Sequence, residues 1–318
     1  MSAPTLSIIH NMIGRAFKQR TVTGVENLQG GLINTNLLIH FDDDESVVLR
    51  IYRDGADTCR KEMVLHQLVQ ETVPVVSIIH AEPDGIDGSD AFAILEYVDA
   101  ITLHQLRRTN NREAIGQAAS SAGKTLANIG RHQFSQPGRI QVDSQRVRIG
   151  ERFVDGDDGI YQMVNGFLES PTLQQRLAPA FVSDLRKLFA EWSPRLAEFN
   201  EHHNLVHCDF GNNNLLVSAE SGRWQVAAVL DWELAISGSP LLDIGHFLRY
   251  DYALQWREPY FSRAFIEHGG SLPADWQSIV RVLDLTALIE CLTHEGLPAD
   301  VKTEIMELMQ ATLNQTRE

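Results

Sequence analysis

The sequence predicts an α+β protein with two lobes, a small β-rich N-terminal lobe at residues 1–97 and a larger, mainly helical C-terminal lobe at residues 98–318. Strand-like runs dominate the first lobe, and helix-like segments dominate the second. A length of 318 residues suits two lobes or two domains. The hydrophobic fraction of 43% and the charged fraction of 22% are those of a globular chain that buries a sizeable core.

The N-terminal lobe is expected to contain a helix, several strands and a second helix. Apolar residues recur at helical spacing between residues 6 and 17. A second helical segment begins near Thr58, which is a candidate N-cap. Apolar runs bounded by turn residues predict strands at 37–41, 47–53, 73–80 and 91–98.

The C-terminal lobe is expected to be helical on both sides of a short stretch of strands. Residues 111–134 and 172–200 have helical composition, and the chain is almost wholly helix-like from Pro240 onward. The short apolar runs between these helices lie at 205–206, 214–217 and 226–230. Polar residues able to perform chemistry gather around these runs.

The chain is acidic, with 42 Asp and Glu residues against 27 Lys and Arg residues and a formal charge of −15. An acidic surface repels the phosphates of nucleic acids, so we expect no nucleic-acid partner. It is compatible with a cationic small molecule, although many proteins are acidic for solubility alone.

Cysteine spacing and hydropathy favour a cytoplasmic protein. Cys59, Cys208 and Cys291 are widely spaced and form no CxxC pair, which argues against a disulfide framework or a zinc ribbon. The first residues lack the charged and apolar regions of a signal peptide. No apolar stretch approaches the roughly 18 residues of a membrane span, so we expect no membrane partner. The sequence does not indicate an oligomeric state.

Three polar residues stand at the ends of the short apolar runs in the second lobe. Asp209 follows the run at 205–206, Asn214 lies five residues later, and Asp231 ends the run VAAVL. Phosphoryl transfer needs one carboxylate to orient the attacking hydroxyl and two oxygen ligands to hold magnesium against the nucleotide phosphates. We expect a β-hairpin to carry Asp209 and Asn214 on one rim, with Asp231 at the end of a neighbouring strand.

These segments, HCDFGNNN and LDWE, resemble the pattern HGDxxxxN and DW(E/D) of the aminoglycoside phosphotransferase family, which shares the bilobal protein-kinase-like fold. The resemblance implies that Asp209 is the catalytic base and that Asn214 and Asp231 are magnesium ligands. It also implies that His207 packs the catalytic loop and that Asp243, in GSPLLDIG, braces it. The chain departs from the family pattern at position 208, where cysteine replaces the usual glycine.

The resemblance extends to the phosphate-binding part of the first lobe. It places Arg50, in VVLRIYR, where the fold carries its phosphate-binding base, and Glu62 where a helix carboxylate pairs with that base. A guanidinium can hold two phosphate oxygens, although lysine is more frequent at this position in protein kinases. Gly30, Gly31 and Asn34 resemble the family's nucleotide-positioning loop.

The segment AILEYVD resembles the connector between the lobes of the family. There the backbone groups of Glu96 and Val98 are expected to hydrogen-bond adenine, and Leu95 is expected to flank the ring. Ala100 stands a little after this connector, where the family often has glycine.

Acidic residues could line the acceptor side of the site, where the family binds its hydroxyl substrate. A polyamine-like acceptor would be attracted to such charge, although each of these residues could equally be a solvated surface group. The candidates are Glu233, Asp155, Asp157, Asp158, Glu290 and Glu295.

The resemblance therefore implies a magnesium-dependent enzyme that transfers the γ-phosphoryl group of ATP or GTP to a hydroxyl of an aminoglycoside-like, cationic small molecule. Antibiotic resistance is the role that such an acceptor suggests. Two alternatives stay open. One is a metabolic kinase for choline, a sugar or a homoserine-like alcohol. The other is a pseudokinase that binds nucleotide without transferring phosphate.

Overall fold

The computed structural model describes residues 4–28, 34–143, 146–152, 156–220, 222–250 and 256–316. The chain forms two compact units, and each unit is built from separate stretches of sequence. The first unit contains residues 1–125, 140–148 and 212–234, and the second contains residues 126–139, 149–211 and 235–318. The first unit thus includes the chain up to residue 125 together with a hairpin from later in the sequence.

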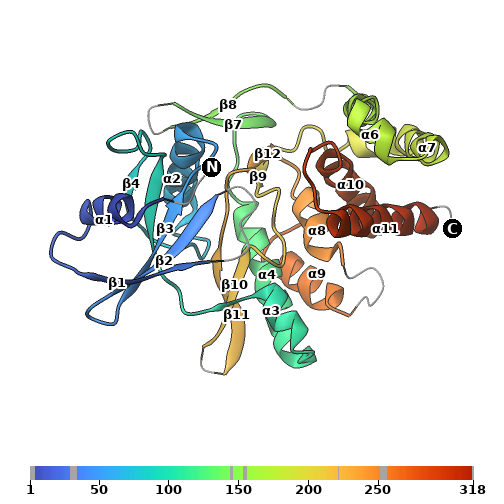
Figure 1. Ribbon diagram of the computed structural model, residues 1–318. Coiled ribbons are helices and arrows are strands. Elements are labelled where there is room, and N and C mark those ends of the chain that lie inside the picture. Colours follow the sequence, from blue (N-terminus) through green and yellow to red (C-terminus); the bar gives the residue numbers. More distant parts are fainter. Residues whose placement is uncertain are drawn as a thin grey trace. The chain divides into compact units, whose positions relative to one another are not determined.

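A five-stranded antiparallel sheet with two helices forms most of the first unit (Figure 1). The sheet order is β1-β2-β3-β5-β4. Its elements are α1 (Leu6–Gly14), β1 (Val22–Asn27), β2 (Thr35–Phe41), β3 (Ser46–Ile51), α2 (Ala56–Val69), β4 (Ile78–Glu82) and β5 (Phe92–Glu96). The strands predicted at 37–41, 47–53 and 91–98 are confirmed as β2, β3 and β5.

Alternation along the strands directs side chains to the two faces of this sheet. Leu49 of β3 and Ile94 of β5 belong to a core cluster with Ile9 and Met12 of α1. The residues next to them along these strands, such as Leu95, pack in a second cluster with side chains of α2. Each face is therefore covered by one helix, and a residue at an even position of β3 faces α2.

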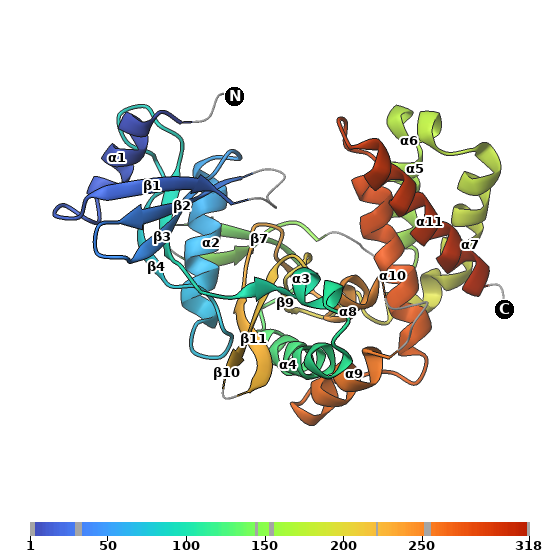
Figure 2. The ribbon, with the colours of Figure 1, turned by 60° about the horizontal axis from the view of Figure 1, so that its bottom comes forward.

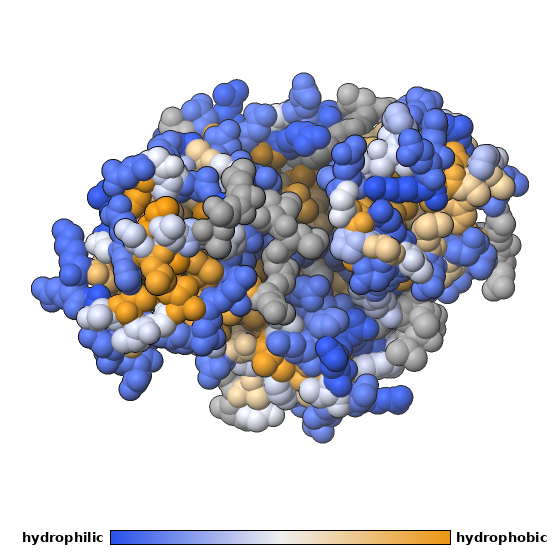
Figure 3. Space-filling model, in the orientation of Figure 1, coloured by the Kyte–Doolittle hydropathy of each residue, from blue (hydrophilic) through white to orange (hydrophobic). Residues whose placement is uncertain are grey.

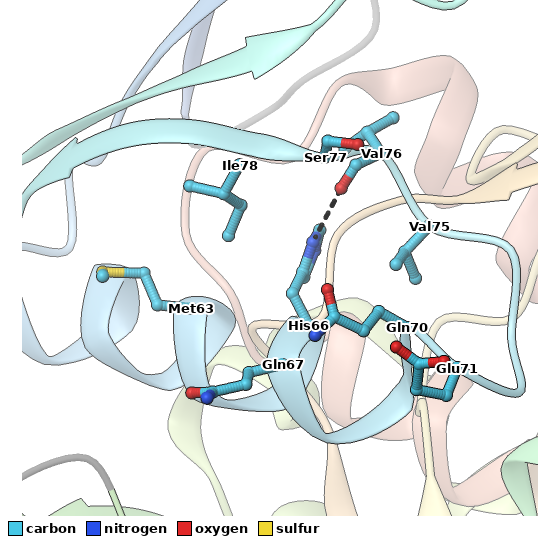
Figure 4. A pocket seen from close by; sticks show the side chains of 9 residues that line it. All are labelled: Met63, His66, Gln67, Gln70, Glu71, Val75, Val76, Ser77 and Ile78. Atoms are coloured by element: carbon cyan, nitrogen blue, oxygen red, sulfur yellow. Dashed lines mark hydrogen bonds between the residues drawn. The ribbon is translucent and has the colours of Figure 1, made fainter. Parts of the chain in front are cut away.

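The strand predicted at 73–80 begins later than expected, at Ile78. Pro74 lacks a backbone N–H and cannot take a full part in a sheet ladder. Val76 is buried without belonging to a strand, and its carbonyl oxygen accepts a hydrogen bond from His66 Nδ1 of α2 at 3.2 Å. Figure 4 shows this bond at the wall of a cavity of about 500 Å³ between α2 and the segment that leads into β4.

A smaller three-stranded sheet also belongs to the first unit. Its strand order is β11-β10-β6, and its strands are β6 (Ile101–Thr102), β10 (Leu215–Glu220) and β11 (Arg223–Val229). Helix α3 (Leu103–Arg108) directly follows β6 along the chain. Antiparallel pairing of Leu215 with Val229 places the start of β10 beside the end of β11. The N–H of Leu230 accordingly donates to the carbonyl oxygen of Asn214 at 2.9 Å.

This pairing corrects the hairpin expected from sequence. Strand β9 (Asn204–Val206), which precedes Asp209, pairs with β12 (Ile236–Gly238) and not with β10. The apolar runs that predicted β9 and β10 do not indicate which strand each one pairs with, because strand pairing depends on tertiary contacts. The hairpin formed by β10 and β11 instead brings together the segments of Asn214 and Asp231.

Helices make up most of the second unit, as expected. They are α5 (Gly159–Leu168), α6 (Pro171–Arg176), α7 (Pro179–Ala197), α8 (Leu241–Leu248), α9 (Glu258–Glu267), α10 (Trp276–Cys291) and α11 (Ala299–Gln315). Figure 2 shows α10 and α11 side by side, with α5 to α7 beyond them. Helix α4 (Arg112–Ile129) passes from the first unit into the second. The sequence analysis missed strands β7 (Gly138–Asp143) and β8 (Arg146–Ile149), whose alternating pattern is short and polar.

Hydrophilic residues cover most of the face seen in Figure 3. Among the described residues, no helix combines the length and the apolar character that crossing a membrane would need.

Close packing of α8 on α10 leads to a stability prediction. A Cβ atom on Gly245 of α8 would lie 2.5 Å from the carbonyl oxygen of Val280 of α10. Gly245→Ala should therefore lower the free energy of unfolding by about 1–3 kcal/mol, since the backbone of α10 must shift. Urea or thermal unfolding measures this change.

Gly166→Ala is the matched control, because Gly166 is exposed inside α5 and a Cβ there meets nothing within 4 Å. It should raise the free energy of unfolding by about 0.5–1 kcal/mol through helix propensity. Equal changes in the free energy of unfolding for Gly245→Ala and Gly166→Ala would contradict the close packing of α8 on α10.

Candidate active site

A buried arginine lies at the centre of a cluster of carboxylates in the first unit. Arg50 is at an even position of β3, so its side chain faces α2, and it is 7% exposed. Its Nη2 atom donates to Glu62 Oε1 at 3.0 Å and to Asp231 Oδ1 at 2.6 Å. The same atom lies 3.6 Å from Glu233 Oε2. These contacts thus bring together strand β3, helix α2 and the turn after β11.

Two further groups besides Arg50 hold the carboxylate of Glu62. Tyr52 donates its hydroxyl to Glu62 Oε2 at 2.6 Å, and the N–H of Trp232 donates to Oε1 at 3.1 Å. Burial raises the pKa of Glu62, while the charge of Arg50 acts in the opposite direction. Tyr52 was not predicted as part of the site, although it lies two residues after Arg50, directly after β3, and packs on the same face of the sheet.

Glu233 was expected on the acceptor side, and the structure places it beside Arg50. Asn34 Nδ2 donates to Glu233 Oε2 at 2.6 Å, and Lys61 Nζ donates to the carbonyl oxygen of Glu233 at 2.6 Å. Burial, together with the charge of Asp231, raises the pKa of Glu233 to about 7. Asn34 in turn accepts a hydrogen bond from the N–H of Arg53 at 3.1 Å.

The cluster carries more negative than positive charge. Carboxylate oxygens of Glu62, Asp231 and Glu233 lie within 4.8 Å of one another, around the single guanidinium of Arg50. Burial alone would lower the pKa of Arg50, but the charges of Glu62 and Asp231 raise it. The Nε atom of Arg50 is buried and has no hydrogen-bond partner among the described residues. A buried N–H donor without a partner, next to three carboxyl groups, is suited to binding an anion together with a divalent cation.

The donor set fits magnesium. Asp231 has a left-handed backbone conformation, with φ of 67°, which is uncommon for a residue with a side chain and marks a constrained position. Asn214 lies directly before β10, next to the end of β11 that positions Asp231. Carboxylate and amide oxygens are the ligands that Mg²⁺ prefers.

Asp209 belongs to the second unit and follows β9 in a braced loop. The N–H groups of His207 and Cys208 donate to the two carboxylate oxygens of Asp243 at 2.7 and 2.8 Å. The N–H of Asp209 is 3.2 Å from His207 Nδ1, which can accept it. Cys208 has φ of 66°, a conformation that glycine adopts at lower cost. The two bonds to Asp243 hold this conformation.

Asp243 and His207 are completely buried. Burial raises the pKa of Asp243 to about 7, although the N–H groups of His207 and Cys208 act in the opposite direction. Sequence reasoning missed His246 of α8, whose Nε2 atom lies 3.0 Å from Asp209 Oδ1. The sequence holds no signal for this contact, because His246 lies far from Asp209 along the chain.

The expected adenine-binding residues lie at the end of β5. Leu95 packs in the core cluster on the α2 face, together with the partly buried Val98. The N–H of Glu96 donates to the carbonyl oxygen of Ser77 at 2.9 Å. An adenine contact by Glu96 would therefore use its carbonyl oxygen. Gly30 and Gly31 lie outside the described residues.

The remaining acceptor-side candidates are exposed residues of the second unit. Asp157 and Asp158 lie directly before α5, Glu290 is in the last turn of α10, and Glu295 follows that helix. In the described part of the chain, none of these four carboxylates forms an ion pair. Asp155 lies outside the described residues.

Sequence comparison decides the family. The profile of the phosphotransferase enzyme family, APH, matches residues 24–279, which is more than three quarters of the chain. The chain belongs to this family. The matched range includes every residue of the carboxylate cluster and of the Asp209 loop.

Solved structures confirm the protein-kinase-like APH fold. Aminoglycoside phosphotransferase APH(4)-Ia is 18% identical, with a TM-score of 0.70 over 98% of this chain and 99% of that chain. The GDP and kanamycin complex of a second aminoglycoside phosphotransferase, APH(2")-IIIa, is 16% identical, with a TM-score of 0.70 over 96% and 98% of the two chains. A protein assigned as a fructosamine-3-kinase from Thermobifida fusca is 17% identical, with a TM-score of 0.65 over 98% and 100%.

Curated relatives match a short segment. Acyl-CoA dehydrogenase family member 11 of Pongo abelii is 41% identical over 59 residues, which is 18% of this APH-family chain and 7% of the relative. The chain therefore corresponds to a small part of that protein.

The buried carboxylate of Asp243 predicts a pH-dependent stability. A carboxyl group whose pKa rises on folding stabilises the folded state most at low pH, and this contribution is lost as pH rises toward the folded pKa of about 7. Asn at this position does not titrate. Between pH 5 and 7, the free energy of unfolding of the wild type minus that of Asp243→Asn should fall by about 1 kcal/mol per pH unit.

Urea unfolding of both proteins at several pH values measures this difference. A difference that stays constant, or that grows with pH, would contradict the raised pKa of Asp243.

Proposed function

We propose that this APH-family protein is a magnesium-dependent O-phosphotransferase that moves the γ-phosphoryl group of ATP or GTP to a hydroxyl of a small molecule. The cluster of Arg50, Glu62 and Asp231 carries the proposal. It places one guanidinium and a surplus of carboxylates on rigid elements, and such a set is suited to a metal–triphosphate.

Each residue of the cluster has a separate role in this proposal. Asp231 and Asn214 would hold the magnesium ion, which when bound neutralises charge on the phosphates. Arg50 would hold phosphate oxygens through its guanidinium, whose buried Nε atom has no hydrogen-bond partner among the described residues. Glu62, held by Tyr52 and Trp232, would keep the guanidinium in place.

Asp209 would orient the acceptor hydroxyl and take its proton. In the transfer, the O–H bond of the acceptor breaks and its proton goes to Asp209. The acceptor oxygen bonds to the γ-phosphorus, and the bond from that phosphorus to the bridging oxygen breaks, which releases the nucleoside diphosphate. His207 and Asp243 would hold the loop in the conformation that presents Asp209.

An aminoglycoside-like acceptor is the first candidate. Two of the solved structures with the same fold are complexes of aminoglycoside phosphotransferases, one with ADP and hygromycin B and the other with GDP and kanamycin. The likeness to the assigned fructosamine-3-kinase favours a second candidate, a small metabolic alcohol or sugar derivative. A role in antibiotic resistance would follow only from an aminoglycoside-like acceptor.

A screen for nucleoside diphosphate release over aminoglycosides, amino sugars and small alcohols, with ATP and with GTP, tests the proposal. Release that depends on both magnesium and one acceptor class supports it. Tight nucleotide binding without release for any acceptor would favour a pseudokinase.

Asp209→Asn should lower the turnover number by on the order of a thousandfold, because the amide cannot accept the proton of the hydroxyl. Nucleotide affinity should stay unchanged, since Asp209 is not in the carboxylate cluster. Asp300→Asn, which changes an exposed carboxylate in the first turn of α11, is the matched control and should keep wild-type turnover. Undiminished turnover in Asp209→Asn would remove Asp209 from the mechanism.

Asp231→Ala should abolish the strengthening of nucleotide binding by magnesium, because the variant loses the carboxylate ligand. Calorimetric titration of ATP with and without magnesium measures the effect. Asp209→Asn serves as the control and should keep the magnesium dependence. A metal-enhanced affinity equal to that of the wild type would contradict the role of Asp231 as a ligand.

A further inference from the structure

One oxygen of the Asp209 carboxylate has a neighbour within the second unit. His246, in the last turn of α8, places its Nε2 atom 3.0 Å from Asp209 Oδ1. The His246 side chain is 17% exposed, while that of Asp209 is 37% exposed. The imidazole thus supports a carboxylate that remains accessible.

Arg249 fixes which nitrogen of the imidazole carries the proton. Its Nη2 atom lies 3.3 Å from His246 Nδ1. A guanidinium can only donate, so Nδ1 accepts, and the neutral ring then carries its proton on Nε2. His246 therefore donates to Asp209 Oδ1.

Arg249 is itself held in position by a buried carboxylate. Its Nε and Nη2 atoms donate to the two oxygens of Asp284 of α10 at 2.9 and 2.7 Å, in a bidentate pair. Asp284 is 3% exposed. A chain of hydrogen bonds therefore runs from the interior of α10 through Arg249 and His246 to Asp209.

Gly211 provides the space for this imidazole. A Cβ atom at position 211 would lie 2.9 Å from His246 Nε2 and 3.0 Å from its Cδ2. Gly211 does not have a positive φ, so its backbone does not demand glycine. The absence of a side chain at this position is what allows His246 to reach Asp209.

We propose that His246 is a positioning residue that holds Asp209 Oδ1 and so orients the carboxylate that receives the proton of the acceptor hydroxyl. This inference rests on the proposed function, in which Asp209 is the base. A carboxylate held by one oxygen has a fixed orientation, and a misplaced catalytic group lowers turnover by a large factor.

Three variants test this role by their kinetics. His246→Ala removes the donor and should lower the turnover number roughly 10- to 100-fold, with little change in the KM for nucleotide. His246→Gln should recover most of this loss, because its amide can donate to Asp209 and accept from Arg249. Gly211→Ala keeps the imidazole but displaces it, and should resemble His246→Ala. His10→Ala, at an exposed position of α1, is the matched control.

The outcomes separate this inference from the proposed function. Full turnover in His246→Ala, or a His246→Gln variant as slow as His246→Ala, would overturn the positioning role while the enzyme stays active. An unfolded His246→Ala leaves the decision to Gly211→Ala, where wild-type turnover would overturn the role. A wild-type protein that phosphorylates no acceptor would overturn the proposed function.

Nitrogen-15 NMR of the histidine side chains provides a readout that needs no activity. The signal of His246, assigned by its loss in His246→Gln, should show a proton on Nε2 and none on Nδ1. A ring protonated at Nδ1 would overturn the inference, whether or not an acceptor has been found.

Discussion

The buried charge of Arg50 constrains three segments of the first unit. Removing a guanidinium from water costs several kcal/mol unless charged partners replace the lost hydration. Glu62 and Asp231 supply those partners from helix α2 and from the turn after β11, so the pairing joins three separate segments at one atom, Nη2. Because Glu233 adds a further carboxylate, the cluster keeps a surplus of negative charge that a divalent cation can neutralise.

The second unit positions the carboxylate of Asp209 in a different way from the ion pairs around Arg50. The loop of Asp209 is held by the backbone bonds to Asp243 on one side, and its carboxylate contacts His246 on the other. The loop tolerates the left-handed conformation of Cys208 because Asp243 accepts the N–H of that residue. An exposed carboxylate on a rigid loop is what a general base requires.

Short patterns in the sequence indicate many of the candidate site residues. Arg50 stands in a strand with clear alternation, and Asp209, Asn214 and Asp231 follow apolar runs at fixed spacing. Strand partners were not readable, since the pairing of β9 with β12 depends on tertiary contacts that a short apolar run does not encode. The position of Glu233 beside Arg50, and the contact of His246 with Asp209, were missed for the same reason. Exposed carboxylates carry no comparable pattern, so the sequence does not select among possible acceptors.

In the proposed function, Asp231 and Asn214 hold the metal of a nucleotide complex. A crystal structure with ADP and Mn²⁺ tests these two ligands, because the anomalous signal of manganese locates the ion independently of the protein. We expect a peak at bonding distance from Asp231 Oδ and the Asn214 side-chain oxygen, with a nucleotide phosphate as a further ligand. A bound nucleotide whose metal contacts neither residue, or no nucleotide at all, would contradict it.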